Sequence, residues 1–179
     1  ECSCRGGGEI RSASWENGSG SDEGRGASES LPFELATQEG HKFLIMGAAV
    51  SPDGKFLASG SGCDELKLWH IDGKFIRNMR GHKDLITSVS FSPDGKQILT
   101  SSEDKTVRIW TNDGRPVRVL NHMSGVKCAA YSPDGRVIVS GGGEEFLRVW
   151  DMDGEQIKTV RSPGNDSFYR VTFRPDGSI

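Results

Sequence analysis

The sequence lacks the features that mark membrane, secreted and nucleic-acid-binding proteins. No stretch approaches the roughly 18 apolar residues that a membrane-spanning helix needs, and no apolar leader segment is visible. Basic residues are not in excess, because 22 lysines and arginines face 25 acidic residues, so no positive field attracts nucleic acid. We therefore expect a protein of the cytoplasm or nucleus that binds neither membranes nor nucleic acids.

Cysteine and histidine are also scarce, and their spacing argues against a disulfide framework or a metal centre. Cys2 and Cys4 have no second pair or histidine beside them, and Cys63 and Cys128 fall at unrelated points of the chain. The three glycines at 141–143 lie between strands rather than before a helix, so they do not form a phosphate-binding loop. These absences predict no metal and no cofactor.

Glycine and serine, by contrast, are concentrated at the start of the chain. Residues 1–30 hold seven glycines, seven serines and one aromatic residue, Trp15. Residues 1–39 carry eight acidic against three basic side chains, whereas the rest of the chain is slightly basic. Such a segment buries too little apolar area to offset its ordering entropy, so we expect 1–30 to be a disordered acidic tail. The folded part is expected over residues 31–179.

The remainder of the chain is built from short strands and tight turns, most clearly in residues 81–110. Strands are predicted at 86–91, 96–101 and 105–110, because apolar and polar side chains alternate there. In the first of them, Thr87, Val89 and Phe91 are predicted to share one face. The turn Ser-Pro-Asp-Gly at 92–95 separates the first two strands, with proline presetting φ and glycine accepting a positive φ.

This unit is repeated along the chain. Pro-Asp-Gly turns recur at spacings of 41, 40 and 42 residues, and Trp69, Trp110 and Trp150 recur at 41 and 40. A histidine follows Gly40, Gly81 and Asn121 at the start of each unit. A period of about 40–45 residues that begins at glycine-histidine and ends at tryptophan resembles the WD40-repeat family. The resemblance covers residues 32–179, with repeats at about 40–80, 81–120, 121–161 and, in part, 162–179.

The resemblance implies an all-β fold, an arc of a β-propeller with about three complete four-stranded blades and partial flanking strands. Residues 33–36 would be an outer strand and 168–173 the opening of a fourth blade, with Ser178 and Ile179 starting its second strand. Strands of the complete blades are expected near 45–50, 55–60, 65–70 and 74–79; 86–91, 96–101, 105–110 and 115–120; 126–131, 136–141, 146–151 and 155–160. Because a closed propeller has about 4–8 blades, we expect apolar blade faces to be open. The chain is then a fragment of a longer propeller, or two copies complete a ring.

A polar set recurs with the repeats. A carboxylate can accept from an imidazole N–H, the other ring nitrogen can accept from a hydroxyl, and the hydroxyl can accept from an indole N–H. The family resemblance implies this structural tetrad for His82, Thr100, Asp104 and Trp110. The other two repeats match it in part, with Cys63 at the aspartate position of the first and glutamate in the third: His41, Ser59 and Trp69; His122, Ser140, Glu144 and Trp150. A set that recurs once per repeat argues for structure and against catalysis, since an enzyme needs one activated nucleophile at one site.

Function is therefore expected on loops that the scaffold holds in place. The resemblance implies a non-catalytic scaffold that binds partner proteins or peptides on the propeller rim. Matched position by position, the rim residues are Leu44, Met46, Leu85, Thr87, Glu103, Gly125, Lys127, Gly143, Ser167 and Tyr169. The large apolar members predict a ligand with apolar anchors. The alternative is a sensor or regulatory segment of a larger enzyme, such as an ATPase or kinase, whose catalytic domain lies elsewhere.

Overall fold

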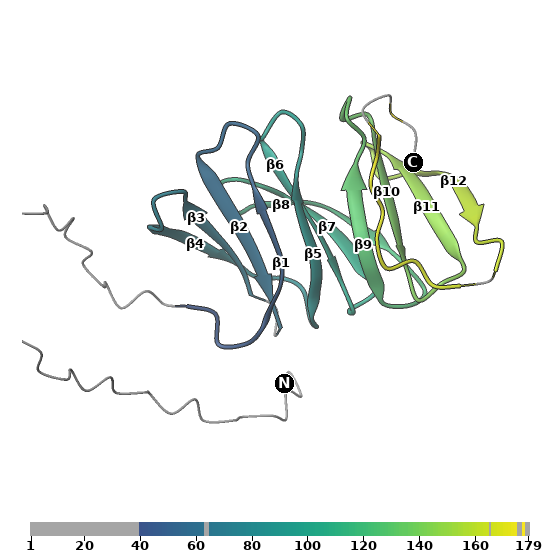
Figure 1. Ribbon diagram of the computed structural model, residues 1–179, viewed down its shortest axis with the longest axis horizontal. Coiled ribbons are helices and arrows are strands. Elements are labelled where there is room, and N and C mark those ends of the chain that lie inside the picture. The colour runs from purple at the N-terminus through teal and green to yellow at the C-terminus, as the bar shows by residue number, and fades with distance from the viewer. Residues whose placement is uncertain (1–39, 63–64, 165, 175–176, 178–179) are drawn as a thin grey trace, which may run out of the picture.

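The computed structural model describes residues 40–62, 65–164, 166–174 and 177, and these form three four-stranded antiparallel sheets (Figure 1). The expected all-β blades are confirmed. The expected tail at 1–30, the outer strand at 33–36, Cys63 and the strand start at 178–179 lie outside the described residues. In the described part of the chain, no helix is long and apolar enough to cross a membrane.

Each sheet is one blade, and its strands follow one another in chain order. The bounds are, for blade 1, β1 (Ile45–Val50), β2 (Phe56–Ser61), β3 (Leu66–His70) and β4 (Phe75–Met79); for blade 2, β5 (Ile86–Phe91), β6 (Gln97–Ser102), β7 (Thr106–Thr111) and β8 (Pro116–Asn121); for blade 3, β9 (Val126–Tyr131), β10 (Val137–Gly142), β11 (Phe146–Asp151) and β12 (Gln156–Arg161). The blades stand side by side, with β1, β5 and β9 as neighbours (Figure 1).

The second strand of each blade begins one residue later than predicted, because the preceding turn uses that residue. In blade 2, Ser92 Oγ donates to Asp94 Oδ1 at 2.6 Å, and the Lys96 N–H donates to the same carboxylate oxygen at 3.1 Å. The glycine of the turn, Gly95, has φ +70°. The same hydrogen bonds recur in the turns of blades 1 and 3, so the three blades share one turn structure.

A β-bulge interrupts the innermost strand of every blade, which overturns part of the predicted alternation. The register shifts between Ile86 and Ser88, so Thr87 has no partner on β6. Ile86 and Val89 are both buried as a result, and the predicted shared face of Thr87, Val89 and Phe91 is wrong. An extra residue in one strand reverses the facing of those that follow.

Residues 168–173 lie where a fourth innermost strand was predicted, but no strand is assigned there. Their described contacts include one backbone bond to blade 3, from the Phe168 N–H to the Gly142 carbonyl at 3.0 Å. No second strand within the described residues pairs with them. Phe168, Val171 and Phe173 nevertheless pack on Cys128, Val139 and Leu147 of blade 3.

Two further apolar clusters fill the junctions between blades. Between blades 1 and 2, Leu66, Leu68 and Met79 pack against Ile86, Ile98 and Trp110. Between blades 2 and 3, the matching positions repeat the arrangement with Val107, Ile109, Leu120, Val126, Ile138 and Trp150. The core is thus a row of blade-to-blade interfaces, and this row positions the loops at the blade edges.

Candidate functional site

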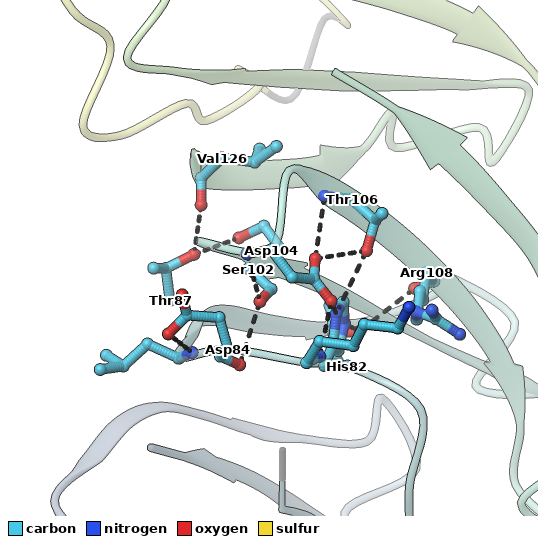
Figure 2. Close-up of polar contacts among 12 residues, drawn as sticks. His82, Asp84, Thr87, Ser102, Asp104, Thr106, Arg108 and Val126 are labelled. Atoms are coloured by element: carbon cyan, nitrogen blue, oxygen red, sulfur yellow. Dashed lines mark hydrogen bonds and ion pairs between the residues drawn. The ribbon is translucent and has the colours of Figure 1, made fainter. Parts of the chain in front are cut away.

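The polar chain of blade 2 runs from the buried tryptophan to a loop. Trp110 Nε1–H donates to Thr100 Oγ1 at 2.9 Å, and Thr100 Oγ1 lies 2.7 Å from His82 Nε2. On the other side of the ring, His82 Nδ1 lies 2.8 Å from Asp104 Oδ2 (Figure 2). This order of donors requires the proton on Nδ1, because Nε2 accepts from the threonine hydroxyl. All four residues predicted for the tetrad are therefore brought together.

The Asp104 carboxylate accepts hydrogen bonds on both of its oxygens. Besides the imidazole, it accepts the Lys83 N–H at 2.9 Å and both the N–H and the hydroxyl of Thr106 at 2.9 and 2.5 Å (Figure 2). Burial by itself would raise the pKa of Asp104, but the bonds from His82 and Thr106 outweigh it and hold the pKa well below its usual value. The charged form of Asp104 thus fastens the loop at 82–83 to the turn before β7.

Blade 1 keeps the hydrogen bonds from tryptophan to hydroxyl and from hydroxyl to histidine, but a different carboxylate lies beyond the histidine ring. Trp69 Nε1–H donates to Ser59 Oγ at 2.8 Å, and Ser59 Oγ lies 2.7 Å from His41 Nε2. Beyond the ring, the carboxylate of Glu65 lies 3.6 Å from His41 Nδ1. Glu65 stands two residues after the predicted aspartate position, where blade 2 has Thr106. Glu65 was not predicted to be a partner of His41, because the family pattern does not mark its position.

Blade 3 corrects the prediction that Glu144 simply takes the place of the aspartate. The inner bonds are kept, with Trp150 and His122 both on Ser140 Oγ at 2.7 and 2.9 Å. Glu144, however, lies 3.9 Å from His122 Nδ1 and accepts the N–H groups of residues 123 and 124 instead. Its extra methylene carries the carboxylate past the ring, where Arg148 also binds it. Burial lowers the pKa of His122 to about 4.

Each of these three sets of hydrogen bonds joins side chains within one blade. Each histidine is committed to a hydroxyl of its own blade, and each hydroxyl is buried beneath a tryptophan. The described residues include no group of three or more histidines, cysteines or carboxylates placed to hold a metal ion. Burial raises the pKa of the Cys128 thiol to about 11, so it is a poor nucleophile at neutral pH.

A repeated backbone bond joins predicted rim residues to each other in blades 2 and 3, and joins Leu44 to Gly62, which was not predicted, in blade 1. The Gly62 N–H donates to the Leu44 carbonyl at 3.3 Å, the Glu103 N–H to the Leu85 carbonyl at 3.0 Å, and the Gly143 N–H to the Gly125 carbonyl at 3.0 Å. The other predicted member in each blade is the bulged residue of the innermost strand: Met46, Thr87 or Lys127. Because a bulge frees its residue from the ladder, it directs that side chain away from the sheet.

The two junctions between rims differ in kind. Between blades 1 and 2, a Cβ at Gly62 would lie 3.4 Å from Phe43 Cβ and 3.9 Å from Leu85 Cδ1, so the surface there is apolar. Between blades 2 and 3, the Glu103 side chain crosses the space left by the missing side chain of Gly125 and forms an ion pair with Lys127. One part of the rim is thus apolar and the next is charged.

The predicted rim residues differ in exposure. Leu44 is 82% exposed, Met46 53% and Tyr169 74%, and Ser167 is also exposed, whereas Leu85 is half-buried. Thr87 is largely used inside the protein, since its hydroxyl donates to the Val126 carbonyl at 2.6 Å and lies 2.8 Å from Ser101 Oγ (Figure 2). Two exposed residues of the same loops, Phe43 and Met123, were missed. Phe43 lies two residues after His41 and Met123 one residue after His122, and this closeness to the repeated histidines was the available signal.

Three antiparallel blades, each with its own Trp–hydroxyl–His chain, define a β-propeller repeat protein, a class that is typically non-catalytic and generally supports protein–protein interaction. The family model for the WD domain, G-beta repeat matches residues 33–70, 73–111 and 114–151. The chain therefore belongs to the WD-repeat family. Each match ends with the third strand of a blade. A comparison with curated proteins found no match.

Proposed function

We propose that the chain is a scaffold that binds a partner peptide on its rim, with apolar anchors seated over blades 1 and 2. The observation that carries this proposal is the apolar surface around Gly62, where Phe43 and Leu85 both come within contact distance of the glycine's missing Cβ. Leu44, 82% exposed, belongs to the same loop as Phe43. Large apolar side chains that gather at an exposed site are typical of protein-binding surfaces.

The charged junction beside it supports a directional contact. Glu103 and Lys127 are each about one-third exposed, so a ligand can reach both groups while they remain paired. A partner that places a polar group here and an apolar group over Gly62 would bind in one orientation only. Charged groups at an interface contribute more to such specificity than to affinity.

The test is partner recovery with the full chain as bait. Leu44→Asp combined with Leu85→Asp should abolish recovery of proteins that the unaltered chain retains. Val117→Asp, on the exposed outer strand β8, is the matched control, because Val117 is 43% exposed and lies away from the rim. Recovery that survives the double substitution, in a protein shown to be folded by circular dichroism, would refute rim binding.

A further inference from the structure

The third strand of every blade carries a cationic side chain at the same register position, opposite the hydroxyl residue of the second strand: Lys67, Arg108 and Arg148. Two of the three meet a carboxylate of their own blade. Lys67 lies 3.8 Å from Glu65, and the Arg148 Nε–H donates to Glu144 at 3.0 Å. Blade 2 has a threonine where blade 1 has Glu65. Its cation, Arg108, therefore lacks the carboxylate that the other two have.

The Arg108 guanidinium is held in place, yet its N–H groups have no acceptor among the described residues. Its Nε is buried without a hydrogen-bond partner. The group lies over the Trp110 ring, 5.9 Å from the centroid, and against Gly81, whose missing Cβ would lie 2.9 Å from Nη1. Arg77 and Arg118 also have an unpaired Nε, but each donates through Nη1 to a carbonyl of the next blade. Arg108 thus differs from both in having free donors on an ordered guanidinium.

Three further cations lie on the loop before β5 and the turn before β7, all exposed and without an ion pair in the described part of the chain: Arg80, Lys83 and Lys105. Arg80 directly precedes Gly81, on which Arg108 lies. The N–H groups of Lys83 and Thr106 both donate to Asp104, so Lys83 and Lys105 flank this carboxylate (Figure 2). We call these three residues and Arg108 the cationic edge of blade 2.

The acidic side chains beside the cationic edge are already engaged. Asp104 accepts hydrogen bonds from His82 and Thr106 as well as from the loop backbone. Asp84 accepts the N–H of the residue that follows it at 2.7 Å, and Glu103 forms an ion pair with Lys127. The edge therefore has an excess of positive charge, which attracts an anionic ligand.

We propose that the cationic edge binds a glutamate or aspartate side chain of the partner peptide. In blades 1 and 3 a carboxylate of the chain meets the matching cation, and in blade 2 the partner supplies this carboxylate to Arg108. A guanidinium binds a carboxylate through two parallel N–H groups, and the exposed lysines attract an acidic segment. The inference rests on the proposed rim binding, because Lys83 lies two residues before Leu85 of the apolar surface. It adds acidic residues to the apolar anchors of the partner.

Peptide binding to the full 179-residue chain tests the inference. The probes are fluorescently labelled hexaglutamate and hexaglutamine, measured by anisotropy at low salt, where screening is weak. Hexaglutamate should bind and shift the Nε–H resonance of Arg108 in NMR spectra, whereas hexaglutamine should do neither. Arg108→Gln should weaken hexaglutamate binding by about tenfold, and so should Lys83→Gln combined with Lys105→Gln.

The matched control is Lys158→Gln combined with Arg170→Gln. It removes the same charge as the double lysine substitution from exposed positions, which have no ion pair within the described residues and lie on blade 3 and the segment after it. It should change the affinity by less than about twofold, since distant exposed charges are screened. Circular dichroism establishes that each variant is folded. If Arg108→Gln does not fold, the double lysine substitution decides, because both of its side chains are exposed.

Three results would overturn the inference. The first is that hexaglutamate does not bind, or binds no better than hexaglutamine. The second is that the control weakens binding as much as the double lysine substitution, which would mean a diffuse field rather than a site. The third is that inorganic phosphate shifts the Arg108 resonance at lower concentration than hexaglutamate, which would mean a site for a free anion. If any of these occurs while partner recovery still depends on Leu44 and Leu85, rim binding stands and only this inference falls.

Discussion

Acid should weaken blade 3 through His122, and the size of the effect follows from the burial of this ring. The side chain is 1% exposed and its neighbours include both Glu144 and Arg148. Burial lowers the pKa of His122 to about 4, from an ordinary value of 6.5. Glu144, at 3.9 Å, opposes this shift but does not overcome it, because its carboxylate is bound by loop N–H groups and by Arg148.

The sign follows from proton binding. As the pH falls below about 6.5, His122 of the unfolded chain takes up a proton, whereas His122 of the folded chain does so only near pH 4. The contribution of the neutral ring is therefore complete above pH 6.5 and is lost as the pH falls toward about 4. A shift of this size corresponds to about 2 to 3 kcal/mol of unfolding free energy between about pH 7 and about pH 4.5.

Urea unfolding at a series of pH values measures this loss. His122→Gln retains a neutral polar group at the position and should reduce the fall in stability over that interval by about 2 kcal/mol. His70→Gln is the control, because His70 is exposed at a strand end, where it pairs with Asp72. The unfolding free energy of His122→Gln should still fall somewhat with falling pH, since burial also lowers the pKa of His41. If His122→Gln and the unaltered chain lose stability in parallel, the assignment of this slope to His122 is wrong.

Two other substitutions test the polar chain and the rim. Asp104→Asn should lower the unfolding free energy by about 2 to 4 kcal/mol, because donors from His82, Lys83 and Thr106 meet its carboxylate. Asp84→Asn, at an exposed loop position, should change it by less than about 0.5 kcal/mol, and equal losses in urea would contradict this ranking. Gly125→Ala must displace the Glu103 carboxylate and break its ion pair with Lys127. It should lower the unfolding free energy by less than about 1 kcal/mol, because the pair is partly exposed. The Lys127 side-chain resonances report the break, and unshifted resonances would contradict it.

The blades could be predicted from the sequence because their turns carry local information. Proline, aspartate and glycine at fixed offsets specify a turn by themselves, and three of the four copies of that turn lie between the first and second strands of complete blades. The tetrad of blade 2 could likewise be matched residue by residue to the family pattern. Local patterns of this kind can be recognised in the sequence without knowing which strands are neighbours in the sheet.

What the sequence could not show depends on distances between separate segments. Strict alternation hid the bulge at Thr87, because an extra residue changes facing without changing composition. Glu65 faces His41 from a position that the family pattern does not mark, and Glu144 misses the ring by the length of one methylene. The crossing of Glu103 over Gly125 could not be predicted either, since the two residues belong to different blades.

The three bulges have a consequence for how such a surface can change. Met46, Thr87 and Lys127 occupy the same place in their blades, yet one is apolar, one is a hydroxyl and one is cationic. None of them has a register partner on the neighbouring strand, so a replacement leaves the pairing of the strands as it is, although at Thr87 it would remove the hydroxyl's bonds to Ser101 and Val126. At Met46, which is 53% exposed, a change of side chain would therefore alter the chemistry of the surface while the pairing of the strands stays as it is.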